Sequence, residues 1–228
     1  MKTDQINEVR AAHREQCYAC RRAKVNCLCG SIKPFATRMR IVILMHYEEA
    51  RAQKTGTARL AKLCLTNAEL LIGTDFTRDE RVNALLQDPA YAPFVLYPGT
   101  DAVNFKTSGR GLFPEGKTPL VFVVDGTWRS AGQLLKHSQN IRALPRLSFS
   151  GGYVSRFAIK KQPMRHCVST IEAVYYLCKE AEEAGYEKLN AQSEVLMELL
   201  KKLVDTQLYY KKVKGRRREE NKKQKGRP

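Results

Sequence analysis

The sequence lacks any long apolar run, and its first residues lack the apolar stretch of a secretory signal. The longest purely aliphatic or Met run covers residues 41–45, which is far too short to cross a bilayer. Acidic residues are also scarce, since 23 Asp and Glu stand against 40 Lys and Arg. The short apolar runs argue against a membrane-spanning protein, and the missing signal stretch argues against an exported one. We therefore expect a cytoplasmic protein that makes no contact with membranes.

Composition indicates a folded protein with a basic surface. The chain has 228 residues, of which 43% are hydrophobic, a share close to that of globular proteins. Its formal net charge is +17. A large positive charge favours a polyanionic partner, because each phosphate neutralised by Lys or Arg releases a condensed counterion. Nucleic acid is therefore the first candidate partner.

The basic charge is concentrated at the C-terminal end. Residues 211–228 contain ten Lys and Arg against two Glu, and no aliphatic or aromatic residue follows Val213. Such a segment has nothing to bury, so we expect a basic, disordered tail. It is either a solubilising end or an arm that contacts an RNA or DNA backbone without sequence preference.

Short β-branched runs alternate with amphipathic stretches over residues 39–210. The predicted strands are residues 40–46, 67–73, 94–97, 120–124 and 144–149, and the predicted helices are residues 57–65, 130–137, 170–184 and 191–210. Residues 67–73 could instead be the end of a helix, but the glycine at position 73 favours a strand. This alternation predicts an α/β domain with a mostly parallel sheet flanked by helices. Ligands are expected beyond the carboxyl ends of its strands.

Four of the seven cysteines fall within thirteen residues. They are Cys17, Cys20, Cys27 and Cys29. In a reducing compartment, clustered thiols at this spacing favour a structural zinc site, since zinc takes four soft ligands in a tetrahedron. Residues 1–38 are therefore predicted to form an N-terminal zinc-binding segment. The alternative is a set of free, buried cysteines.

A carboxylate ends the best predicted strand. Asp125 is followed by Gly126, Thr127 and Trp128, the only tryptophan of the chain. Asp125 would lie where parallel sheets bind ligands. The structural alternative is a helix N-cap at Thr127 followed by an aromatic core residue.

Two further motifs precede predicted helices. Residues 54–60 read Lys-Thr-Gly-Thr-Ala-Arg-Leu, a loop whose backbone amides suit an anion. Ser169 and Glu172 fit a capping box, which is the default interpretation of that tetrapeptide. Neither motif identifies a ligand by itself.

Taken together, these motifs resemble the DTW-domain family. The resemblance rests on Cys17-x2-Cys20-x6-Cys27-x-Cys29, His46-x-Glu48 leading to Thr57-Ala58-Arg59-Leu60, Asp125-Gly126-Thr127-Trp128, Leu144-Pro145-Arg146-Leu147-Ser148 and Ser169-Thr170-Ile171-Glu172-Ala173. One departure is visible. The family often has His-Pro-x-Glu where this chain has His46-Tyr47-Glu48-Glu49.

The resemblance implies a tRNA-uridine aminocarboxypropyltransferase, similar to the bacterial members that modify the variable loop. Such enzymes use S-adenosylmethionine to place a 3-amino-3-carboxypropyl group on N3 of a uridine and release methylthioadenosine. The resemblance also implies a SPOUT-like core, which can be knotted, although general chain-topology rules predict against knots. We expect such an enzyme to work as a monomer on tRNA.

The resemblance also suggests roles for site residues. Arg59 and the amides around Thr57 would hold the donor's carboxylate, and Asp125 would act as base or bind the donor's ammonium or ribose. The full set expected to bind the donor is Thr57, Arg59, Asp125, Gly126, Thr127, Trp128, Leu147, Ser169, Thr170 and Glu172. Two rival hypotheses are a non-catalytic zinc-containing RNA-binding protein and an RNA methyltransferase that uses the same donor.

Overall fold

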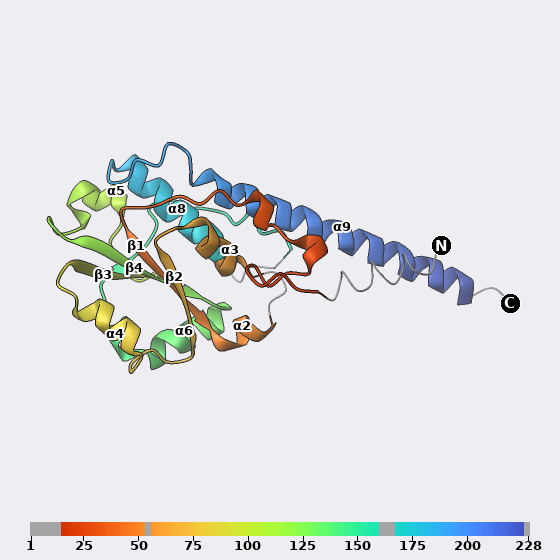
Figure 1. The fold of residues 1–228 in the computed structure, drawn as a ribbon, viewed down its shortest axis with the longest axis horizontal. Coiled ribbons are helices and arrows are strands. Elements are labelled where there is room, and N and C mark those ends of the chain that lie inside the picture. The colour runs from red at the N-terminus through yellow and green to blue at the C-terminus, as the bar shows by residue number, and fades with distance from the viewer. Residues whose placement is uncertain (1–14, 53–55, 160–166, 226–228) are drawn as a thin grey trace.

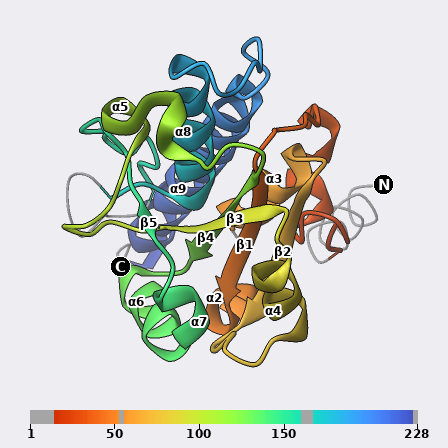
Figure 2. The same ribbon diagram turned by 90° about the vertical axis from the view of Figure 1, so that its left-hand side faces the viewer.

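A parallel sheet forms the centre of the molecule in the computed structural model, which describes residues 15–52, 56–159 and 167–225 (Figures 1 and 2). Its strands are β1 (Arg40–His46), β2 (Ala68–Gly73), β3 (Tyr91–Leu96), β4 (Thr118–Asp125) and β5 (Arg146–Leu147). They are ordered β2-β1-β4-β3-β5, and every neighbouring pair is parallel. The predicted α/β class and its parallel sheet are confirmed.

The two central strands are buried on both faces. Almost every residue of β1 and β4 is buried, as continuous Val, Ile and Leu runs predict for the middle of a parallel sheet. The register places Met45 opposite Asp125, so both strands end at the same edge of the sheet. That edge is where the functional motifs gather.

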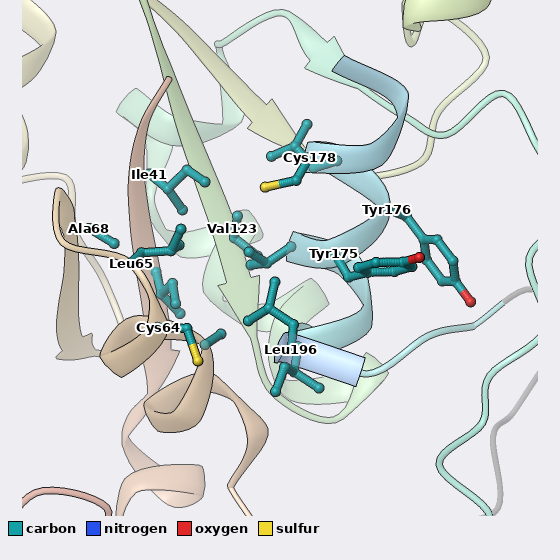
Figure 3. Close-up of a cluster of buried hydrophobic side chains, with 14 of the residues drawn as sticks. Ile41, Cys64, Leu65, Ala68, Val123, Tyr175, Tyr176, Cys178 and Leu196 are labelled. Carbon is teal, nitrogen blue, oxygen red and sulfur yellow. The ribbon is translucent and has the colours of Figure 1, made fainter. Parts of the chain in front are cut away.

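Helices cover the sheet on both faces. One face packs against α3 (Thr57–Cys64), α8 (Thr170–Glu183) and α9 (Glu194–Lys225), and the other against α4 (Glu80–Gln87), α6 (Trp128–His137) and α7 (Gln139–Arg142). Figure 3 shows the larger core, in which Ile41 and Val123 of the sheet face Cys178 of α8 and Leu196 of α9. Both layers of side chains exclude water from the sheet.

The shorter elements lie in the connections. They are α2 (Tyr47–Ala52), α5 (Phe105–Ser108) and three 3-10 turns at Lys24–Asn26, Cys29–Ser31 and Gly109–Leu112. None of the helices in the described part of the chain meets the length and hydropathy that a transmembrane span requires.

The C-terminal prediction is wrong in one respect. The helix predicted over residues 191–210 continues as α9 to Lys225, so residues 211–225 are helical rather than a disordered tail. Lys, Arg, Glu and Gln are all good helix formers, and the backbone hydrogen bonds of a helix need no apolar face. The basic segment therefore prolongs the last helix away from the sheet (Figure 1).

The topology creates a switch point between β1 and β4. From β1 the chain runs through α3, on one face, to β2, whereas from β4 it runs through α6, on the opposite face, to β5. The connections therefore diverge at the carboxyl ends of two adjacent strands. In open α/β sheets a crevice for ligands forms at this place.

Candidate active site and metal centre

A cavity of about 630 Å³ opens at this switch point. Its size falls within the range of about 300–1,000 Å³ typical of small-molecule sites. Its walls come from the carboxyl ends of β3 and β4, the N-termini of α3, α6 and α8, and the loop after β5. The predicted site residues that line it are Thr57, Asp125, Gly126, Thr127, Trp128, Leu147, Ser169 and Thr170.

Asp125, at the end of β4, lines the cavity and is buried, with 5% of its surface exposed. The hydroxyl of Thr170 donates a hydrogen bond to its Oδ1. This bond joins the end of β4 to the first residue of α8, two elements 45 residues apart in sequence. The carboxylate is thus held in place within a largely apolar cavity.

The turn after Asp125 is shaped by two small residues. Thr127 caps α6, because its Oγ1 accepts a hydrogen bond of 3.1 Å from the amide of Ser130, so the predicted N-cap is confirmed. A Cβ on Gly126 would lie 2.8 Å from the Ser130 hydroxyl and 3.1 Å from the amide of Ala131. Only glycine lets the turn pack this closely on the helix.

Trp128 is not a core residue. It is half-buried and lines the cavity, with its ring 5.9 Å from the ring of Tyr97 at 50°. The expectation of an aromatic core residue behind the turn is therefore wrong, because α6 starts at Trp128 and turns its first residue toward the cavity. Its ring therefore forms part of the cavity wall.

The Gly-Thr loop reaches the cavity through Thr57, at the start of α3. Arg59 does not line the cavity, although it interacts electrostatically with Asp125. Burial lowers the pKa of the Arg59 guanidinium, the charge of Arg21 lowers that pKa further, and Asp125 raises it. Lys54 and Thr55 of the predicted anion loop lie outside the described residues.

Glu172 has a structural role, as the capping interpretation predicted. Its carboxylate accepts hydrogen bonds from the amide and hydroxyl of Ser169, from the hydroxyl of Ser155 and from the amide of Arg156. It is fully buried and does not line the cavity. Its position therefore does not support the prediction that it binds a donor molecule.

A second buried carboxylate holds the same loop. Glu180, further along α8, accepts hydrogen bonds from the amide and hydroxyl of Ser150. Glu172 and Glu180 thus fix the loop that follows β5 at two points. This loop contributes Phe149 and Phe157 to the cavity wall.

Three aromatic residues of the wall were not among the predicted site residues. Tyr97, Phe149 and Phe157 line the cavity, and all three lie on loops with no local motif. In the sequence, only the Leu144–Ser148 motif of the family resemblance pointed to this region. Together with Trp128 these rings make the cavity a site for a ligand with a flat, apolar part.

Glu49 was also missed, although its motif was visible. It is 7% exposed, and its Oε1 accepts a hydrogen bond of 3.1 Å from the amide of Thr127. Its buried Oε2 has no hydrogen-bond partner within the described part of the chain. The carboxylate on α2 therefore positions the turn that carries Asp125. The glutamate that ends the family's His-Pro-x-Glu pattern corresponds to this residue.

Replacing Glu49 should disturb the turn. Glu49→Ala leaves the Thr127 amide without its acceptor, and losing a buried hydrogen bond to a carboxylate costs about 1.5–3 kcal/mol. We expect a lower midpoint in urea unfolding for Glu49→Ala and a smaller change for Glu49→Gln, which keeps a carbonyl oxygen. The control is Glu48→Ala, on the same helix but exposed. Equal midpoints for Glu49→Ala and Glu48→Ala would contradict the role.

The four clustered cysteines converge as the spacing predicts. Their Sγ atoms all lie within 4.8 Å of one another, with Cys17 and Cys29 3.7 Å apart and Cys20 and Cys27 3.8 Å apart. Tetrahedral zinc, bound at about 2.3 Å per thiolate, places its sulfur ligands about 3.8 Å apart. The geometry therefore fits zinc and, with four protein ligands, leaves no open position for catalysis.

Local hydrogen bonds favour the thiolate form at one ligand. The backbone amides of Cys20 and Ala19 donate to Cys17 and lower the pKa of its thiol to about 6. The Arg22 guanidinium, which is 6% exposed, also lies close enough to Cys20, Cys27 and Cys29 to interact with their charge. The amide hydrogen bonds favour the deprotonated sulfur at Cys17, and the Arg22 charge favours it at the other three ligands, whereas burial raises the pKa of the Cys29 thiol.

The cysteine segment is attached to the rest of the molecule on two sides. Arg22 Nη2 donates to the carbonyl of Gly56, at the N-terminus of α3, over 3.5 Å. Lys202 of α9 donates to the hydroxyl of Ser31, and Tyr210 of α9 to the side-chain carbonyl of Asn26. The four-cysteine cluster therefore lies beside α3 and α9, next to one wall of the cavity.

These features define a parallel α/β protein with an aromatic-lined cavity at the switch point of its sheet and a four-cysteine cluster whose geometry fits zinc. The chain belongs to the DTW-domain family, since the model of the DTW domain matches residues 14–208. The predicted family is thereby confirmed.

The chain is similar to several curated proteins that are named tRNA-uridine aminocarboxypropyltransferases. The chain is 25% identical over 205 residues to tRNA-uridine aminocarboxypropyltransferase 2 of Mus musculus, covering 88% of this chain and 66% of the relative. It is 30% identical to the Drosophila melanogaster protein of that name, covering 70% of this chain and 63% of the relative. With tRNA-uridine aminocarboxypropyltransferase A of Arabidopsis thaliana it shares 29% identity, over 90% of this chain and 86% of the relative.

The chain spans slightly less than two thirds of the length of the mouse and fly relatives. No solved structure is significantly similar to it.

Proposed function

We propose that this protein transfers the 3-amino-3-carboxypropyl group of S-adenosylmethionine to N3 of a uridine in tRNA. The observation that carries the proposal is the meeting of Asp125, Thr57 and Thr170 in one cavity at the switch point of the sheet. The names of the curated relatives support the same activity.

The cavity residues suit the donor. The aromatic rings of Tyr97, Trp128 and Phe157 offer an apolar surface for its adenine, and the amides at Thr57 suit its carboxylate. S-adenosylmethionine supplies an electrophilic carbon beside a sulfonium that departs without charge. The protein's task is therefore to orient that carbon, rather than the methyl, toward the uridine.

A base is needed because uridine N3 is a poor nucleophile while it holds its proton. We propose that the Asp125 carboxylate accepts this proton as the N3–carbon bond forms and the carbon–sulfur bond breaks, releasing methylthioadenosine. The Thr170 hydroxyl keeps the carboxylate oriented through its hydrogen bond to Oδ1. Arg59, close to Asp125, supplies positive charge near the reacting groups.

The remaining parts of the proposal concern the substrate and the scaffold. The four-cysteine centre holds structural zinc, the basic end of α9 contacts the RNA backbone, and the modified uridine lies in the variable loop of tRNA in the cytoplasm. The enzyme acts as a monomer.

We also propose that the core is SPOUT-like and knotted. The path of the chain just before α8 bears on this point, and residues 160–166 there lie outside the described residues.

The test is product analysis. Purified protein is incubated with unmodified tRNA and S-adenosylmethionine, and the RNA is digested for nucleoside mass spectrometry. We expect a uridine with an added aminocarboxypropyl group, together with methylthioadenosine. Omission of the donor is the control.

Two other outcomes would contradict the proposal. A methylated nucleoside would identify an ordinary methyltransferase. Binding of tRNA without any product would favour a non-catalytic RNA-binding protein, a hypothesis that explains the basic charge and the cysteines but gives no reason for the cavity around Asp125.

A further inference from the structure

The turn Cys17–Arg22, which contains the first two cysteines, presents two side chains to solvent. Tyr18 is 90% exposed, more than any other large hydrophobic residue described, and Arg21 is also exposed. The turn is closed by hydrogen bonds from the amide of Cys17 to the carbonyl of Arg22 and from the amide of Arg21 to the carbonyl of Cys17. Its geometry is therefore fixed by the backbone and by the cysteines.

Arg21 adopts a backbone conformation that favours glycine. Its φ is +58°, in the left-handed region, where a residue with a long side chain is uncommon. Such strain is retained where the surrounding structure enforces it, and it often marks a functional position. Here it directs an arginine away from the core and into solvent.

This turn lies next to the cavity. Arg22, the following residue, contacts the carbonyl of Gly56, and Gly56 immediately precedes the cavity residue Thr57. Arg21 is the neighbour of Arg22, which contacts Gly56, three residues before Arg59, and the charge of Arg21 lowers the pKa of the Arg59 guanidinium. Among the described residues, neither Arg21 nor Arg59 forms an ion pair with a carboxylate.

Two cations held close together, each outside any ion pair of the described chain, suit an anion. A backbone phosphodiester is the anion that an RNA substrate would bring to this turn beside the cavity. An exposed aromatic ring beside a phosphate contact is in turn suited to stack on an unpaired base, because single-stranded RNA is recognised largely by stacking on aromatic side chains.

We propose that the turn Cys17–Arg22 binds an unpaired nucleotide adjacent to the target uridine. Arg21 and Arg59 hold a backbone phosphate, and Tyr18 stacks on the neighbouring base. The inference rests on the proposed function and adds to it the surface that holds the unpaired RNA next to the cavity. This agrees with the chemistry, since N3 lies on the Watson–Crick edge and is hidden in a base pair.

The test compares matched variants of the full chain. Tyr18→Leu keeps an apolar side chain but removes the ring. Tyr18→Phe keeps the ring and removes only the hydroxyl. Stacking on one base is worth about 1–3 kcal/mol, so Tyr18→Leu should weaken the affinity for unmodified tRNA about 5- to 150-fold. Tyr18→Phe should bind within about twofold of the wild type. Affinity is measured by fluorescence anisotropy at fixed salt.

Arg21 is tested through the salt dependence of the same affinity. Removing one phosphate contact should reduce the slope of log affinity against log salt by about one in Arg21→Ala, whereas Tyr18→Leu should leave the slope unchanged. The control is Lys117→Ala, an exposed lysine just before β4, at the opposite end of the strands. Its removal should change neither quantity beyond the general loss of one charge.

Binding of S-adenosylmethionine, measured by calorimetry, should be unaffected in the Tyr18 variants. Wild-type affinity in Tyr18→Leu, or a slope in Arg21→Ala equal to that of Lys117→Ala, would overturn the inference. Failure of the proposed function is seen separately, as the absence of aminocarboxypropyl product with the wild-type protein. The affinity measurement remains informative in that case, because it requires no turnover.

Discussion

Asp125→Asn is expected to lose nearly all modification of uridine N3 while remaining folded. The amide has the same size and keeps an oxygen that can accept the hydrogen bond from Thr170, so the turn should hold its shape. It cannot accept the N3 proton. A general base contributes about 10²–10⁴-fold to a rate, and we expect a loss of this order in single-turnover reactions with saturating tRNA and donor.

The pH dependence separates the role of base from a role in donor binding. If Asp125 removes the proton, the deficit of Asp125→Asn should shrink as pH rises, because N3 then loses its proton to solvent without help. If Asp125 instead binds the donor's ammonium or ribose, calorimetry should show weaker donor binding and the deficit should not depend on pH. Asp205→Asn, the same change at an exposed position of α9, is the control. Near-normal activity of Asp125→Asn would end its candidacy.

Cys20→Ser is expected to abolish stoichiometric zinc and to lower the thermal stability of the chain. Cys20 is the most buried of the four clustered cysteines, with 3% of its surface exposed. The binding free energy of a structural zinc ion, about 10–16 kcal/mol in isolated zinc-finger peptides, is available to hold the folded segment only while all ligands are present. Metal analysis and a thermal unfolding scan measure the two effects.

Loss of the metal should also reach the cavity. Without zinc, the segment no longer fixes Arg22 against Gly56, so the start of α3 loses one of its contacts and tRNA turnover should fall. The control is Cys178→Ala, a fully buried cysteine of α8 outside the cluster, which should retain full zinc. Full zinc content in Cys20→Ser would show that the cluster is not a four-cysteine site.

The strand at residues 40–46 was predictable because its apolar run is continuous, and it matches β1. The strand at residues 67–73 was predicted from the glycine that ends it, and it matches β2 within one residue. The short helices were harder. Helix α4 was not predicted, although Asp79 caps it with hydrogen bonds to two amides, and α7 lasts four residues. Such helices depend on tertiary packing more than on any pattern within them.

The candidate site was predictable where a motif sits on a regular element. Thr57, Asp125 and Thr170 each begin or end a helix or strand, and such ends gather beyond the carboxyl edge of a parallel sheet. Phe149 and Phe157 were not predictable, because they reach the cavity through a loop whose path depends on contacts with Glu172 and Glu180. The capping-box pattern correctly predicted that Glu172 accepts hydrogen bonds at the start of α8. No sequence pattern, however, distinguishes a structural carboxylate from one that binds a ligand.

The hydrogen bond between Thr170 and Asp125 has a consequence for biosynthesis. All five strands of the described sheet are complete by Leu147, yet the partner of the Asp125 carboxylate and one wall of the cavity arrive only with the start of α8. A nascent chain that has emerged from the ribosome as far as its last strand therefore possesses a sheet without a finished pocket. The enzyme becomes competent late in its own translation, after the polypeptide has returned to the edge where β4 ends.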